Sequence, residues 1–84
     1  MGTPGSYYDP AKYREGAVVR VASRPTLEAF FKNWKLHHPL QRAQLEYAGQ
    51  PAKVLKSYMG HGGDILYELE GIPGIWHEQC VEAV

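Results

Sequence analysis

Residues 51–70 read PAKVLKSYMGHGGDILYELE and determine the fold class. Residues 52–59 alternate between two sets of side chains, which is typical of a β-strand. Over residues 65–70 one face of a second strand collects the apolar side chains Ile65, Tyr67 and Leu69. Between the two runs, the glycine-rich segment 60–64 tolerates the positive φ angles of a tight turn. The stretch therefore predicts an antiparallel β-hairpin.

The flanking sequence predicts three more strands. Residues 17–22 form a run rich in β-branched side chains that follows a glycine, so a strand is expected there. Downstream, the pattern predicts a turn over residues 71–74, a short strand over 75–77, a tight bend at 78–79 and a last short strand over 80–83.

A change of period between the first two strands predicts helical structure. Large apolar residues recur there at i, i+3, i+4 and i+7, namely Leu27, Phe30, Phe31 and Trp34. This spacing predicts an amphipathic helix over residues 25–36, whose apolar face packs on the sheet or, as the alternative, is exposed and binds a partner. Pro39 ends this helix, and the sequence over about 39–47 predicts a second, short helix, with an irregular loop as the alternative.

Composition limits the chain to one small domain. Its 84 residues are 44% hydrophobic and can build one core, but not the two lobes of an enzyme with a cleft between them. Nine Lys and Arg balance nine Asp and Glu, and no basic cluster marks a nucleic-acid surface, so we expect no nucleic-acid partner. Residues 64–84 contain acidic residues and no Lys or Arg, which suits a basic partner or a solvated face.

The cysteine content and the hydropathy indicate the compartment. Cys80 is the single cysteine, which excludes an internal disulfide. No apolar run approaches the length of a membrane span or of a signal-peptide core. We therefore expect no membrane partner and a cytoplasmic location.

The predicted elements together indicate a mainly β fold with an α insertion. Five short strands, with the helical segments confined between the first two, favour a small, partly open barrel over a parallel sheet. Residues 13–84 would form this single domain, preceded by residues 1–12 as an N-terminal arm that is mobile or bound to a partner. Tyrosines crowd this region at Tyr7, Tyr8 and Tyr13, which favours an arm that lies against the domain or a partner.

Several segments resemble known barrels. Residues 74–82, Gly-Ile-Trp-His-Glu-Gln-Cys-Val-Glu, resemble the ending of SH3-like barrels, where a strand meets one tight helical turn and a last short strand closes the barrel. Over roughly residues 13–84 the chain resembles the C-terminal barrel of the nitrile hydratase β subunit and the small accessory proteins related to it. The similar segments are residues 13–21, His38-Pro39, residues 47–54, residues 66–69 and residues 76–82.

The resemblance implies a supporting role. In nitrile hydratase an iron or cobalt ion is held by a cysteine cluster on the α subunit, and this chain has one cysteine. The resemblance therefore implies a non-catalytic subunit or an assembly factor. The alternative is a β-type subunit of a metal-dependent nitrile hydratase-like enzyme whose α partner carries the metal.

Aromatic residues on the predicted strands provide the candidate binding surface. With a histidine at the tip of the hairpin they could line one side of the barrel, and the set is Tyr58, His61, Tyr67, Trp76 and His77. The alternative places Trp76 and Tyr67 in the barrel core, with Tyr58 covering an edge. The tyrosines of the arm could occupy such a groove in the same chain or in a second copy.

We predict no catalytic residue and no cofactor. The sequence lacks a glycine-rich loop before a helix and a nucleophile elbow, and Cys80 is expected to be a small buried apolar residue. His37 and His38 are adjacent and lack metal-ligand spacing, although small-ligand or metal binding at His61 and His77 is a further alternative. The sequence favours a protein–protein interaction module, not an enzyme by itself, that binds another protein or a second copy.

Overall fold

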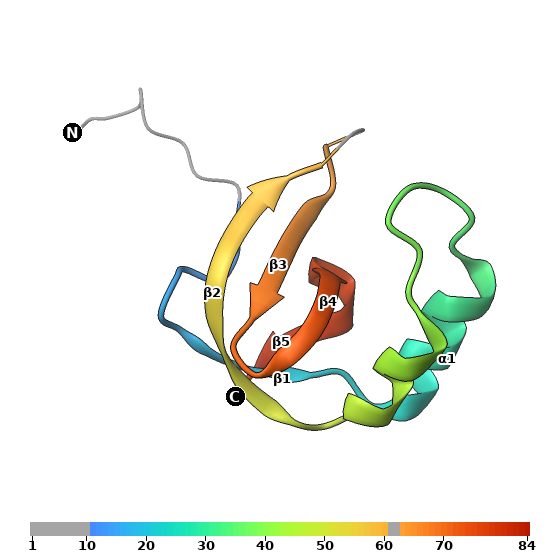
Figure 1. The fold of residues 1–84 in the computed structure, drawn as a ribbon, viewed down its shortest axis with the longest axis horizontal. Coiled ribbons are helices and arrows are strands. Elements are labelled where there is room, and N and C mark those ends of the chain that lie inside the picture. Colours follow the sequence, from blue (N-terminus) through green and yellow to red (C-terminus); the bar gives the residue numbers. More distant parts are fainter. Residues whose placement is uncertain (1–10, 61–62) are drawn as a thin grey trace.

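The computed structural model describes residues 11–60 and 63–84 and confirms a small, mainly β fold with an inserted helix (Figure 1). In chain order the elements are β1 (Val18–Val21), α1 (Arg24–Asn33), the 3-10 helix η1 (Arg42–Tyr47), β2 (Pro51–Met59), β3 (Ile65–Leu69), β4 (Ile72–His77), the 3-10 turn η3 (Glu78–Cys80) and β5 (Val81–Ala83). No helix in these two ranges is both long enough and apolar enough to cross a membrane.

The five strands form one open antiparallel sheet in the order β4-β3-β2-β1-β5. β2 is the longest strand and has two partners. Its first half pairs with β1, where Lys53 lies opposite Val18, and its second half pairs with β3, where Met59 lies opposite Ile65. This second pairing confirms the predicted hairpin. β4 and β5 form the two edges of the sheet, and β5 is joined to β1.

β4 begins earlier than the sequence predicts. Instead of a turn over residues 71–74, the chain reverses at residues 70–71, and Ile72 already pairs across the hairpin. Gly71 has a φ of 76°, which glycine adopts without steric cost and which allows so short a turn. Pro73 is tolerated in β4 because this is an edge strand, where a missing N–H need not break a bond to a neighbouring strand.

α1 is shorter than predicted and ends at Asn33 rather than at residue 36. Trp34 leaves the helix with a ψ of 119°, and its indole Nε1–H donates to the His37 carbonyl oxygen at 2.7 Å. This bond stabilises the non-helical path of the residues that follow α1.

The second predicted helix, over about 39–47, is present only as η1 and is a 3-10 helix. Gln44 sets its start, because the side-chain Oε1 accepts a hydrogen bond from Gln41 N–H at 2.7 Å. Leu40 precedes this cap and is buried in the core. Pro39 and Gln41 are exposed, so residues 39–41 run along the surface, insert Leu40 into the core and precede the helix rather than extend it.

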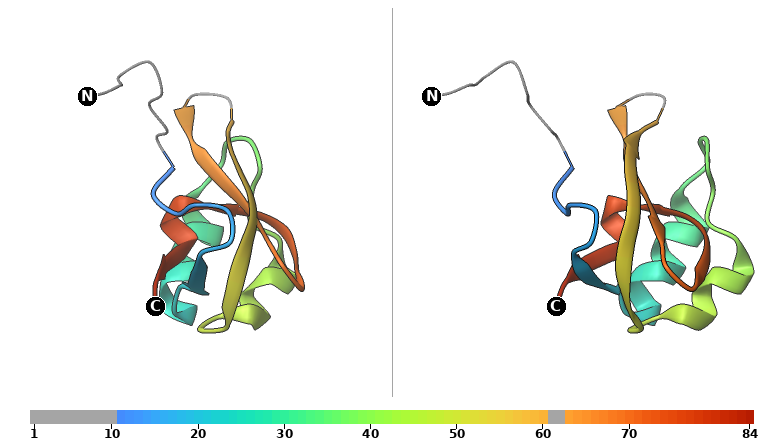
Figure 2. Two further views of the ribbon diagram at one scale, coloured as in Figure 1. Left: turned by 90° about the vertical axis from the view of Figure 1, so that its left-hand side faces the viewer. Right: turned by 60° about the vertical axis from the view of Figure 1, so that its left-hand side comes forward.

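The core lies between the sheet and the segment that connects β1 to β2. Figure 2 shows α1 and η1 together on one side of the sheet, away from residues 11–17. Leu27 and Phe30 are buried, whereas Phe31 and Trp34 are half-buried, so the apolar face of α1 is core at its centre and partly exposed at its border. The other buried apolar residues of the core are Val19, Val21, Ala22, Leu40, Leu45, Val54, Tyr67, Leu69, Ile72, Trp76, Cys80 and Val81.

Candidate functional site

The residues predicted to bind a partner do not form one exposed surface. Trp76 and Tyr67 are fully buried, His77 is 2% exposed, and Tyr58 is half-buried on β2. Trp76 lies opposite Tyr67 in the β3–β4 pairing, and both belong to the hydrophobic core. The structure thus places these two residues in the core, which is the alternative to a groove. His61 lies outside the described residues.

The Tyr67 hydroxyl joins the start of the described chain to η3. It accepts hydrogen bonds from the backbone N–H groups of Lys12 and Tyr13, at 3.0 and 3.2 Å, and it donates to Glu78 Oε2 at 2.5 Å. Burial and the bond to Glu78 raise the pKa of Tyr67 to about 12, so the hydroxyl keeps its proton at neutral pH. The Tyr13 ring packs on Tyr67 with 5.7 Å between centroids, and the other two tyrosines of the arm lie outside the described residues.

His77 anchors the loop that follows α1. Its Nε2 carries the proton and donates to the His38 carbonyl oxygen at 2.8 Å, because a carbonyl oxygen only accepts. The imidazole also contacts Phe30 and Trp34, with 4.7 and 4.8 Å between ring centroids. Burial lowers the pKa of His77 from 6.5, so the neutral ring predominates at neutral pH.

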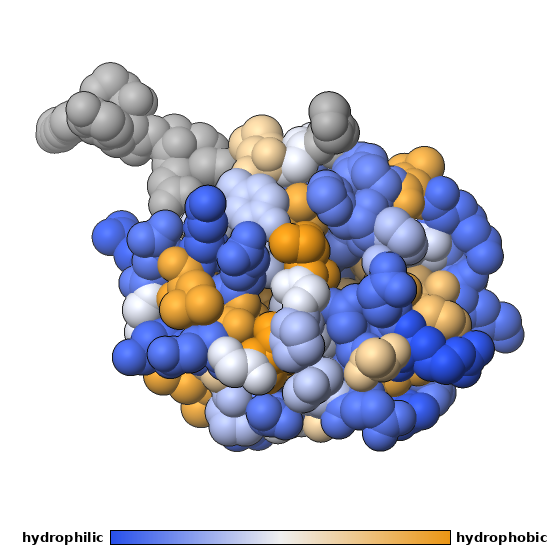
Figure 3. Space-filling model, viewed as in Figure 1, coloured by the Kyte–Doolittle hydropathy of each residue, from blue (hydrophilic) through white to orange (hydrophobic). Residues whose placement is uncertain are grey.

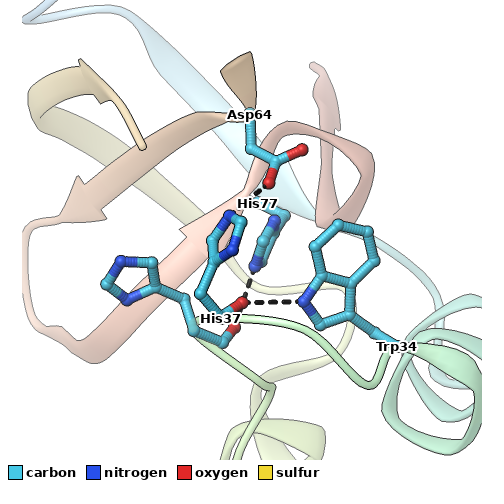
Figure 4. A network of polar contacts seen from close by, with 5 residues as sticks. Trp34, His37, Asp64 and His77 are labelled. Carbon is cyan, nitrogen blue, oxygen red and sulfur yellow. Dashed lines mark hydrogen bonds and ion pairs between the residues drawn. The ribbon is translucent and has the colours of Figure 1, made fainter. Parts of the chain in front are cut away.

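A chain of polar contacts continues from this loop to the β2–β3 turn (Figure 4). Trp34 Nε1 donates to the His37 carbonyl oxygen, and His37 Nε2 lies 2.6 Å from Asp64 Oδ2. His37 and Asp64 are partly buried, with side chains 28% and 25% exposed. The contacts hold Trp34 in place at the border of α1.

An open depression runs along α1 beside η3, and we call it the aromatic groove. It has a volume of about 530 Å³ and is lined by Pro25, Thr26, Ala29, Phe30, Asn33, Trp34 and Gln79. Phe30 and Trp34 stack with 5.1 Å between ring centroids and 14° between ring planes. Asn33 and Gln79 add amide groups that donate and accept hydrogen bonds. Aromatic surface with a few polar groups is the usual lining of a ligand or peptide site.

The sequence contains one signal for the aromatic groove. Pro25, Ala29 and Asn33 recur every four residues on α1, so they share a helix face next to the aromatic pair. Short side chains in such a row leave room beside a large ring. Gln79 gave no signal, because it belongs to η3 and reaches the groove only through the fold.

The same region holds no reactive thiolate and no cluster of metal ligands among the described residues. The Cys80 thiol is buried, which raises its pKa to about 12, so it is not a thiolate at neutral pH. In residues 11–60 and 63–84, no three or more His, Cys, Asp and Glu side chains are grouped so as to hold a metal ion. The sequence offers two histidines as candidate metal ligands, His61 and His77. Of these, His77 uses its Nε2–H to donate a hydrogen bond to the His38 carbonyl oxygen.

The chain matches no protein-family model, no curated protein and no solved structure.

Proposed function

We propose that the chain is a non-catalytic protein–protein interaction module that binds an apolar segment of a partner protein in the aromatic groove. The observation that carries the proposal is the stacked Phe30–Trp34 pair, whose Trp34 ring is half-buried beside an open depression. Tryptophan rings of this kind are frequent anchors of protein interfaces. The buried tryptophan of the sheet already serves the core, so Trp34 is the one available at the surface.

The groove suits a segment bound in an extended form. An apolar side chain of the partner would lie on the Phe30–Trp34 stack, and the amides of Asn33 and Gln79 would bind its backbone. Trp34 is already held by its bond to the His37 carbonyl oxygen and by the His77 ring. Little side-chain freedom is then lost on binding, which favours affinity.

We further propose that the sheet is an SH3-like barrel related to the C-terminal barrel of the nitrile hydratase β subunit, and that the chain is an accessory or subunit-like protein of the cytoplasm. Two features support this relation: η3 is a single 3-10 turn between β4 and β5, and β5 pairs with β1. The same two features support the alternative, a β-type subunit whose α partner carries the metal.

The test is an affinity pull-down from native lysate with three forms of the chain, followed by mass spectrometry. Ala29→Arg fills the aromatic groove from an exposed helix position, and Arg is a good helix former, so the fold should persist. Ala83→Arg places the same side chain on exposed β5, away from the groove. Circular dichroism and light scattering check that all three forms are folded and have the same oligomeric state.

We expect proteins that are retained by the wild type and by Ala83→Arg but lost with Ala29→Arg. A metal-bearing α-type subunit among them would favour the β-type subunit over a free-standing module. If the two variants retain the same proteins as the wild type, the aromatic groove is not the binding surface and the proposal is overturned.

A further inference from the structure

A second open depression lies on the other side of α1, between this helix and η1, and we call it the basic groove. Its volume is about 530 Å³. The charged residues that line it are Arg24, Glu28, Lys32, Lys35 and Arg42. Figure 3 shows this side of the molecule, over α1 and η1, as mostly hydrophilic surface around smaller hydrophobic areas. Four cations against one carboxylate make the groove basic, although the chain as a whole has no net charge.

Most of the positive charge in the basic groove is uncompensated. Arg24 is paired twice, with Glu28 at 2.9 Å and with Glu46 at 3.8 Å. Within residues 11–60 and 63–84, Lys32, Lys35 and Arg42 form no ion pair with a carboxylate. Three cations therefore face the solvent around one depression.

The floor of the basic groove is apolar. Phe31 is half-buried and Leu45 is buried, and the Arg42 guanidinium lies over the Phe31 ring at 5.2 Å from its centroid. A cation held over an aromatic face keeps its donors available for a carboxylate. The chemistry thus fits a ligand with both carboxylates and an apolar side chain.

The charges favour a separate acidic protein over the other sources of negative charge. In the chain's own acidic stretch, Asp64 contacts His37 and Glu78 binds Tyr67, and the exposed Glu70 and Glu82 lie on different elements, the β3–β4 turn and β5. A separate protein can instead present several carboxylates side by side in one segment. Nucleic acids bind to broader arrays of cations, whereas these three surround an apolar floor.

We propose that the basic groove docks an acidic segment of another protein. Its carboxylates pair with Lys32, Lys35 and Arg42, and an apolar or aromatic side chain packs on Phe31 and Leu45. The inference goes beyond the proposed function, because it concerns a different groove and names the charge of the partner.

The test measures fluorescence anisotropy with a short labelled peptide of glutamates around a central Phe-Leu pair. The wild type should bind it at low salt, with an affinity that falls as salt rises. Lys32→Gln with Lys35→Gln should weaken binding about fivefold or more. The control, Lys53→Gln with Lys56→Gln on β2, removes the same charge outside the groove and should change binding less than about twofold. Circular dichroism verifies that both double variants are folded.

Three further arms separate the alternatives. The peptide with glutamine in place of glutamate should bind at least about fivefold more weakly, and equal binding would overturn the proposal. Tighter binding of a single-stranded oligonucleotide than of the acidic peptide would overturn it in favour of nucleic acid. Self-association at low salt that the groove variant abolishes would overturn it in favour of a second copy.

The Ala29→Arg variant distinguishes the two grooves. It should bind the acidic peptide as the wild type does, because it changes only the aromatic groove. If the wild type does not bind the acidic peptide at all, the proposal for the basic groove is overturned. The proposal for the aromatic groove is tested separately by the pull-down.

Discussion

Two aromatic pairs of similar size have opposite surroundings in this molecule. Tyr67 and Trp76 lie opposite each other on neighbouring strands and are fully buried, whereas Phe30 and Trp34 stack at the end of α1, where Phe30 is buried, Trp34 is half-buried and both border an open groove. The two tryptophan N–H groups differ in the same way. Trp34 Nε1 donates to the His37 carbonyl oxygen, while Trp76 Nε1 is buried and has no hydrogen-bond partner among the described residues. Position in the fold, more than residue type, separates a core ring from a ring at the surface.

The largest expected effect compares the two tryptophans directly. Trp76→Ala should lower the free energy of unfolding by about 4 to 5 kcal/mol, because it leaves a cavity beneath the sheet. Trp34→Ala should cost about 1 to 2 kcal/mol, because the ring is already partly exposed in the folded chain. Urea unfolding of both variants measures the difference, and equal losses would contradict the assignment of Trp34 to a surface role.

Phe30 links the two regions and should give the next effect. It is 8% exposed, stacks on Trp34 and contacts His77. Phe30→Ala should lower the free energy of unfolding by about 3 kcal/mol in the same urea experiment. A loss below about 1 kcal/mol would mean that this face of α1 is not core.

The Tyr67 hydroxyl adds a polar contribution to the buried pair. Tyr67→Phe should destabilise the chain by about 1 to 2 kcal/mol, because the Tyr13 N–H loses its acceptor and Glu78 loses a donor, while the Lys12 N–H keeps Glu78 Oε2 at 2.9 Å. Hydrogen exchange should speed up at the Tyr13 amide before it does elsewhere. Tyr58→Phe, at a half-buried position on β2, is the control and should leave this exchange rate unchanged.

The pH dependence of the helix-side cluster should be the smallest effect. Because burial lowers the pKa of His77 in the folded state, the unfolded chain binds the proton more readily. The contribution of His77 to the free energy of unfolding is therefore fully present above pH 6.5, and it is lost as the pH falls below that value toward the folded pKa. NMR titration of the ring measures this directly. A His77 pKa at or above 6.5 would contradict the burial argument. The control is His38→Asn, which removes an exposed ring and keeps a residue that tolerates the positive φ at this position. The pKa of His77 should stay low in this variant.

Local patterns in the sequence predict most of the elements. The alternation in residues 51–70 predicts the hairpin, and the helical spacing that begins at Leu27 predicts α1, because both depend on neighbours within a few positions. The structure places the end of α1 and the start of β4 at earlier residues than the sequence predicts. The hydrogen bond between Trp34 and the His37 carbonyl oxygen holds the chain outside the helix, and the tight turn at Gly71 lets β4 begin early.

The candidate site depends on contacts that local patterns do not contain. Trp34 and Trp76 are both tryptophans in an apolar pattern, so the sequence does not distinguish them. The partial exposure of Trp34 and the burial of Trp76 follow from which elements of the fold cover each ring. The approach of His37 to Asp64, and of Gln79 to α1, joins segments that are distant in the sequence. Such pairings become visible only when the chain is folded.

The two partners of β2 also have a consequence for how the chain folds. β2, β3 and β4 are joined by short connections, so their pairing closes small loops and can form early. The β1–β5 pairing instead brings Val19 beside Ala83, close to the two ends of the described chain. That pairing closes a longer loop, which costs more chain entropy, and it gains only a three-residue strand. β5 should therefore be the last strand to dock during folding and the first to detach.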